Sequence, residues 1–261
     1  PKGYVGLWDP SGRLSLAIER QTPRGLLGCF GFGSPEEGLL DFFCTETTKK
    51  AWKEFIDRQS KPQLLPHVEI PPGYCLELLR EMGRKKAPPA LEAGLKGFGD
   101  LRYEGPSPLI YAHVSPDEVR DRPSLLGRIG EIFEIVPFFG FWALEEEKLR
   151  PHYEEFRTAS ESPLALTEAQ KAQRFDGIIL KALEDLFPEG VRRALKRSLE
   201  ELALILFKGQ GRDKAEVALA AALDVERPPS ALGPNALLRE IFLRALEIFR
   251  EPQQQSLILK P

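Results

Sequence analysis

Residues 4–32 read YVGLWDPSGRLSLAIERQTPRGLLGCFGF, and this stretch predicts how the N-terminal part of the chain folds. In its middle, residues 13–19 alternate between polar and apolar side chains, which is typical of a strand with one buried face. Turn-forming sequences at 9–12 and 22–25 separate this strand from the apolar runs on either side. Three short strands joined by tight turns predict an antiparallel meander.

The chain directly after the meander has two interpretations. In Ser34-Pro35-Glu36-Glu37, serine occupies a possible N-cap position, proline the first helical position and Glu37 the third, which is typical of a helix start. Residues 38–44 fit a fourth strand equally well. Residues 45–59 predict a helix, because their apolar side chains fall on one stripe among charges. A second helix is expected at 72–86 and another strand at 109–114.

From residue 115 onward the pattern is helical. Ser115-Pro116-Asp117-Glu118 carries a capping signature, and Thr167 with Gln170 forms a capping box. The helices expected in this part cover about residues 124–136, 145–158, 168–187, 190–208, 212–224 and 235–250. The predicted fold class is α+β, with a small N-terminal antiparallel sheet followed by a larger, mainly α-helical region. We place the boundary between a strand-bearing mixed region, 1–114, and a helical region, 115–261, and leave open whether the two form one continuous domain.

One helical pair has a recognisable spacing. The sequence reads Leu199-x2-Leu202-Ala203-x2-Leu206, then Ala215-x3-Leu219, Ala222 and Pro228, with Gly209 and Gly211 between the helices. Residues 199–228 thereby resemble a single tetratricopeptide unit, which implies two helices in close contact at small residues. The same period recurs neither before nor after this stretch. We therefore expect a single αα-hairpin rather than a solenoid.

Composition excludes several classes of protein. The 261 residues are 42% hydrophobic and 29% charged with a net charge of −3, so neither a disordered chain nor a basic nucleic-acid coat is expected. No run of 18 apolar residues suggests a membrane span. Residues 1–4 have no secretory n-region or h-region and no initiator Met, so residues could be missing upstream. By elimination we expect a cytoplasmic location.

Cysteine usage and glycine usage give no cofactor signal. Cys29, Cys44 and Cys75 are odd in number and lack CxxC spacing, so we expect reduced, mostly buried thiols. These cysteines with His67 have the ligand types of a zinc site, but their spacing matches no zinc motif. The glycines at 25–33 do not read GxGxxG, and no P-loop occurs. We therefore predict no metal and no cofactor.

Three residues are catalytic candidates: Asp41, His67 and His113. Asp41 interrupts an apolar segment, where a carboxylate must be paired, capped or exposed. His113 lies near Ser115 and Asp117, although helix capping explains those two better. The alternative function, a metal-assisted hydrolase or nucleic-acid enzyme, requires at least two of the candidates to converge in one pocket.

Basic residues cluster at 84–86 and at 192–197. The first cluster ends a helix, where cations favour the helix dipole. In the second, Lys196 and Arg197 stand four residues before Glu200 and Glu201, which predicts ion pairs on a solvated helix face. Nucleic acid is therefore not an expected partner.

Two segments are candidate partner-binding sites. The densest aromatic group consists of Phe133, Phe138, Phe139, Phe141 and Trp142, and is either a buried plug or an exposed patch, with the last four as the candidate binding residues. Near the C-terminus, Leu257 and Ile258 lie in a short segment with strand character that we expect to dock on a sheet edge or in a groove. We therefore favour a non-catalytic protein-interaction or scaffold protein with a protein partner or a second copy of itself, and without a membrane.

Overall fold

The computed structural model describes residues 1–261 except 62, 121–122, 138–143, 162–166, 230–234 and 251–261. Its elements, in chain order, are β1 (Lys2–Leu7), β2 (Leu14–Thr22), β3 (Gly25–Ser34), β4 (Gly38–Thr47), α1 (Lys49–Ser60), β5 (Leu65–Ile70), α2 (Pro72–Lys85), α3 (Leu91–Leu95), η1 (Lys96–Phe98), η2 (Leu109–Ala112), α4 (Pro116–Val119), α5 (Pro123–Leu126), α6 (Gly130–Ile135), α7 (Glu146–Ser160), α8 (Glu168–Leu186), α9 (Glu189–Gly209), α10 (Arg212–Glu226) and α11 (Ala236–Arg250). An antiparallel sheet followed by a mainly helical region confirms the predicted α+β class.

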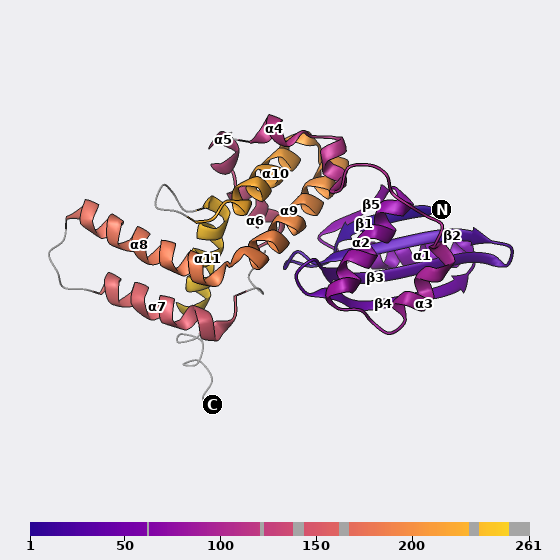
Figure 1. Ribbon diagram of the computed structural model, residues 1–261, viewed down its shortest axis with the longest axis horizontal. Coiled ribbons are helices and arrows are strands. Elements are labelled where there is room, and N and C mark those ends of the chain that lie inside the picture. Colours follow the sequence, from indigo (N-terminus) through magenta and orange to yellow (C-terminus); the bar gives the residue numbers. More distant parts are fainter. Residues whose placement is uncertain (62, 121–122, 138–143, 162–166, 230–234, 251–261) are drawn as a thin grey trace, which may run out of the picture.

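The five strands form one sheet in the order β4-β3-β2-β1-β5, with every neighbouring pair antiparallel. β4 and β5 are therefore the two edges. α2 packs on one face against β1, β2 and β4, while α1 lies on the other face against β3 and β5. The sheet with α1, α2 and α3 lies at one end of the molecule, and α7, α8 and α11 lie at the other (Figure 1).

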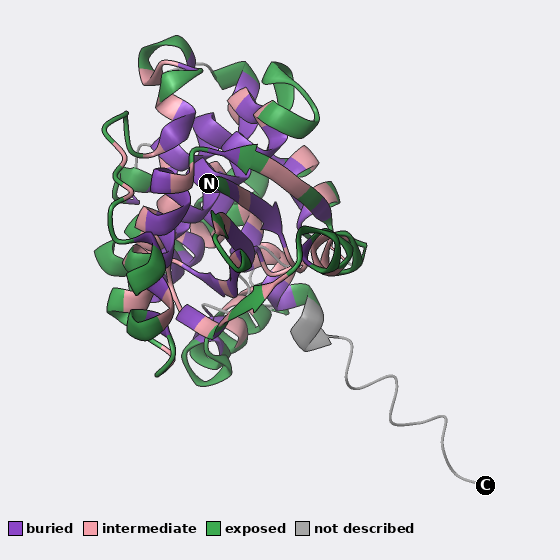
Figure 2. Cartoon of the chain, turned by 90° about the vertical axis from the view of Figure 1, so that its right-hand side faces the viewer, coloured by how far each residue is buried: buried purple, intermediate pink, exposed green. Residues whose placement is uncertain are grey.

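Two buried apolar clusters hold the fold together. The larger one extends from the α2 face of the sheet, where it includes Leu16 and Leu79, to α9 and α10, where it includes Leu199 and Leu219. The smaller one lies on the α1 face and contains Ala17, Leu26, Phe30 and Trp52. In the view of Figure 2, buried residues fill the centre, and exposed residues lie on the outer turns and helices.

The β3–β4 hairpin resolves the ambiguity that the sequence leaves after the meander. Residues 38–44 lie in strand β4, and the segment before them is a turn rather than a helix start. In that turn the Ser34 hydroxyl accepts a hydrogen bond from the Glu37 N–H at 3.0 Å. Gly38 has φ +83°, a conformation that favours glycine, and so ends the turn.

Two predictions about elements were wrong. Residues 109–114 form no strand; Leu109–Ala112 form the 3₁₀ turn η2, in which Leu109 and Ile110 are buried. A short apolar run does not distinguish a strand from a buried helical turn. The expected helix at 124–136 is divided into α5 and α6. α7 to α11 lie within a few residues of their predicted positions, and the capping box at Thr167 is confirmed.

The helical pair at 199–228 is the hairpin of α9 and α10, whose small residues Ala215 and Ala222 are fully buried. α7 and α8 pack as a second pair of neighbouring helices. No helix in the described part of the chain is both long and apolar enough to cross a membrane.

Candidate functional site

Alternation in the strands gives the two sheet faces different chemistry. On the α2 face the strands present aliphatic residues such as Val5, Leu16 and Ile18 to the main core. On the α1 face, β3 presents aromatic rings, and α1 covers the sheet only in part. The Trp52 ring of α1 lies directly over Gly28, where an added Cβ would be 2.6 Å from the ring. Glycine at this position therefore allows helix and sheet to approach closely.

Five rings on this face form a continuous cluster, which we call the aromatic surface: Trp8, Phe30, Phe32, Phe43 and Phe55. Trp8 stacks on Phe32 with ring centroids 5.2 Å apart. Phe30, which is buried, contacts Trp8, Phe43 and Phe55 at 6.1, 6.0 and 5.4 Å. Phe43 is 37% exposed, and Trp8 and Phe32 are half-buried. The sheet therefore offers solvent four partly exposed aromatic residues, which lie around the buried Phe30.

The neighbouring turns give the aromatic surface an acidic rim. Asp41 lies directly opposite Phe32 in the β3–β4 register and is exposed. Arg13 bonds Glu37 through two nitrogens at 2.7 and 2.8 Å and bonds Asp9 at 3.2 Å. These bonds hold the pKa of Arg13 above its usual value, so the guanidinium stays charged. Three carboxylates against one guanidinium leave the rim negative.

His67 on β5 lies in a polar cluster beside this surface. The Ser60 hydroxyl donates to the Ile56 carbonyl at 2.9 Å, so it accepts the Nδ1–H of His67 at 2.7 Å. The Nε2 atom of His67 then accepts from the Ser15 hydroxyl at 3.0 Å. Burial lowers the pKa of His67 to about 4, which keeps the ring neutral near pH 7. Ser15 is fully buried, so its hydroxyl has no contact with solvent.

The other two catalytic candidates have different surroundings. Asp41 lies on β4, at the edge of the sheet opposite to β5 and His67. Its carboxylate accepts a hydrogen bond from the Phe42 N–H at 2.8 Å and so caps a backbone donor of the edge strand. His113, beyond η2, stacks on Phe207 of α9 at 4.8 Å. The three candidates thus lie on separate parts of the fold.

The cysteines differ from our expectation of three separate thiols. The register of β3 and β4 sets Cys29 directly opposite Cys44, with Cα atoms 4.0 Å apart, and the two form a disulfide. Cys75 is a free, buried cysteine, and burial raises the pKa of its thiol to about 12. Among the described residues, no group of three or more His, Cys, Asp or Glu is placed to hold a metal ion.

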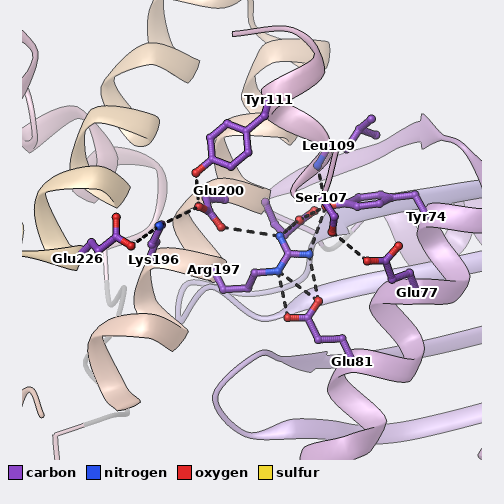
Figure 3. A network of polar contacts seen from close by, with 11 residues as sticks. Tyr74, Glu77, Glu81, Ser107, Leu109, Tyr111, Lys196, Arg197, Glu200 and Glu226 are labelled. Atoms are coloured by element: carbon purple, nitrogen blue, oxygen red, sulfur yellow. Dashed lines mark hydrogen bonds and ion pairs between the residues drawn. The ribbon is translucent and has the colours of Figure 1, made fainter. Parts of the chain in front are cut away.

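A buried ion network joins the sheet region to the helices (Figure 3). Arg197 of α9 is 13% exposed and bonds Glu81 of α2 at 3.1 Å through Nε. It also bonds Glu201, whose side chain is fully buried and accepts a hydrogen bond from the Tyr74 hydroxyl. The Tyr74 oxygen in turn accepts the Leu109 N–H at 3.1 Å. We call this group, together with Tyr111, Lys196, Glu200 and Glu226, the joint network.

The second half of the joint network is built on Lys196 and Glu200 of α9, which directly precede Arg197 and Glu201 in the sequence. Glu200 accepts a hydrogen bond from Tyr111, and Lys196 bonds Glu226 at 2.8 Å and lies 3.9 Å from Glu200. Burial raises the pKa of Glu200 and of Glu201. The predicted pairing at i,i+4 is present, but the expectation of a solvated face is wrong here, because both glutamates are buried, Glu200 against Tyr111 and Glu201 against Tyr74 of α2.

The predicted partner-binding residues lie outside the described residues: Phe138, Phe139, Phe141 and Trp142 fall within 138–143, and Leu257 and Ile258 within 251–261. The aromatic surface, by contrast, was not predicted. A signal for it exists in the sequence, because Phe30 and Phe32 stand two residues apart and therefore share one face of a strand.

Comparison with known protein families, with curated protein sequences and with solved structures finds no match to this chain.

Proposed function

We propose that this chain is a non-catalytic protein-interaction protein whose aromatic surface binds a partner segment that carries both apolar and cationic side chains. The observation that supports this proposal is the group of rings on a partly covered sheet face. Aromatic side chains are enriched at the centres of protein interfaces, where they bury large areas at a small cost in conformational entropy. The rings here are already fixed by mutual packing.

The rim determines the chemistry of the partner. Asp9, Glu37 and Asp41 give this end of the sheet a negative charge that Arg13 offsets only in part. A lysine or arginine side chain beside such a rim is attracted to the carboxylates and also to the face of an exposed indole or phenyl ring. An acidic segment would be repelled.

The positions of the catalytic candidates support the same choice. A hydrolase requires two of Asp41, His67 and His113 to meet a substrate together, whereas they lie on opposite sheet edges and beyond η2. Of the two hydroxyls that His67 contacts, that of Ser15 is fully buried. A binding function requires none of these groups to react.

The proposal is tested with a labelled peptide of alternating arginine and leucine, titrated with the full chain in a fluorescence anisotropy assay. We expect saturable binding that Trp8→Ala weakens by about 30-fold, the effect of losing one aromatic anchor worth about 2 kcal/mol. Asp41→Asn should weaken binding several-fold. Phe175→Ala is the matched control, because Phe175 is a half-buried ring that pairs with Phe156 in the helical region.

Two results would contradict the proposal. One is binding that Trp8→Ala and Asp41→Asn leave unchanged, or that a glutamate–leucine peptide reproduces. The other is a wild-type dimer in analytical ultracentrifugation that Trp8→Ala dissociates, because the surface would then be occupied by a second copy of the chain.

A further inference from the structure

A shallow pocket on the outer side of α2 gathers arginines without partners. Its volume is about 270 Å³, and its lining consists of Gly73, Glu77, Arg80, Arg84, Leu101, Arg102 and Tyr103. Gly73, Glu77, Arg80 and Arg84 recur at helical spacing along one stripe of α2, and residues 101–103 form the facing wall. The pocket is thus a groove between a helix and an extended segment.

The local packing determines where Arg102 stands. An added Cβ on Gly73 would lie 2.2 Å from the Arg102 carbonyl oxygen, so only glycine lets this segment approach the first turn of α2. The next residue, Tyr103, is also held in place, since its ring lies edge-on to Tyr74 with centroids 5.0 Å apart and its hydroxyl donates to the Pro106 carbonyl at 3.1 Å. Arg102 is therefore held on the wall opposite Arg80 and Arg84.

The three guanidinium groups are free to bind a ligand. Arg80, Arg84 and Arg102 are exposed, and within the described ranges no hydrogen bond or ion pair engages their side chains. Arg80 and Arg84 stand one helical turn apart, so both can reach one anion. The acidic residue in the lining, Glu77, accepts a hydrogen bond from the Ser107 hydroxyl at 2.9 Å. Three cations against one carboxylate leave the groove with two positive charges, in a chain whose net charge is −3.

We propose that this groove binds a small phosphate-bearing ligand. A phosphate group carries close to two negative charges at neutral pH and several acceptor oxygens, which match the charge of the groove and the forked donors of arginine. A single carboxylate would neutralise only one of the two charges. Tyr103, whose pKa is raised mainly by desolvation, stays uncharged and gives one end of the groove an apolar wall for the organic part of a phosphomonoester.

The site is tested by isothermal titration of the full chain with inorganic phosphate, pyrophosphate, AMP and a twelve-nucleotide thymidine strand. We expect saturable binding of a phosphate-bearing small molecule that weakens as salt concentration rises. Each of Arg80→Gln, Arg84→Gln and Arg102→Gln should weaken this binding by about tenfold. Arg24→Gln is the control, because Arg24 is an exposed arginine in the β2–β3 turn outside this groove and its loss removes the same charge.

The outcomes distinguish a specific phosphate-binding site from general electrostatic attraction between a phosphate and any exposed arginine. Equal weakening by Arg24→Gln, or no saturable binding of any small phosphate, would overturn the proposal. Binding of the thymidine strand alone, with the same dependence on the three arginines, would assign the groove to nucleic acid and also overturn it. Since the three side chains are exposed, circular dichroism melts of the variants should match the wild type and exclude a loss of folding.

Discussion

Replacing Arg197 with methionine is the sharpest test of how the sheet region and the helices are joined. Methionine keeps most of the length and the apolar stem of the side chain but removes its charge. Glu201 would then retain the Tyr74 hydroxyl as a donor, while its Oε2 atom is already buried without a partner. Glu81 would lose the guanidinium that bonds it at 3.1 to 3.2 Å.

The expected cost follows from the burial of Glu201. Its side chain has no exposed surface, so water cannot replace the lost cation. Removing one member of a buried ion pair costs about 3–5 kcal/mol, and we expect Arg197→Met to lower the free energy of unfolding by that amount near pH 7.5. Arg193→Met is the matched control, since Arg193 makes an i,i+4 pair with Glu189 on the same helix but both are exposed. Its cost should stay within about 0.5 kcal/mol.

The pH dependence of this cost has a definite sign. Burial already holds the pKa of Glu201 above its usual value, and Arg197 opposes that effect. Without Arg197 the pKa rises further, so the folded chain binds a proton at a pH where the unfolded chain does not. Stability of the variant relative to wild type should therefore increase as the pH falls from 8 towards 5.

Urea unfolding followed by circular dichroism measures these differences, and Arg197→Met/Glu201→Gln completes a double-mutant cycle. We expect the double variant to be no less stable than Arg197→Met, because the uncompensated charge is gone. A loss below about 1 kcal/mol for Arg197→Met, or additive effects in the cycle, would refute the argument that Arg197 compensates a buried carboxylate.

Three further predictions concern the sheet. Gly28→Ala should cost about 1–3 kcal/mol in urea unfolding, because its Cβ would meet the Trp52 ring at 2.6 Å. Reducing the Cys29–Cys44 disulfide, which closes a loop of 15 residues, should cost about 3 kcal/mol in melts with and without a reductant. His67 has its pKa lowered to about 4, so the unfolded chain binds the proton first and stability should fall between pH 6.5 and 4; His67→Gln should remove this fall.

Local sequence patterns were sufficient to predict β2 and the start of α8, because alternation and helix capping depend only on residues close in the chain. Alternation at 13–19 predicted β2, and capping at Thr167 predicted the start of α8. β5 was missed because Pro66 argues against a strand. At an edge, however, a residue without an N–H donor is tolerated when that side of the strand lacks a partner strand. A proline by itself does not reveal whether a strand lies at the edge of a sheet.

The disulfide and the aromatic surface depend on register, which local patterns leave open. Cys29 meets Cys44, and Phe30 meets Phe43, only when the turn after Ser34 and the irregularity between Phe32 and Gly33 set the pairing. Shifting a strand by one residue exchanges its two faces, and would place the rings against α2. Their position on the α1 face therefore follows from the hairpin geometry rather than from composition.

The joint network shows most clearly what spacing alone does not reveal. The i,i+4 separation of Arg197 and Glu201 predicts that they pair, but whether the pair is solvated depends on Tyr74 and Glu81, which are more than a hundred residues away in the chain. An apolar contact between α2 and α9 would tolerate sliding, since one aliphatic side chain replaces another with little loss. A buried carboxylate is compensated in one arrangement only, so any shift of α9 along α2 leaves a charge unpaired. We therefore expect the network to determine how the helices dock on the sheet region more than it adds to stability.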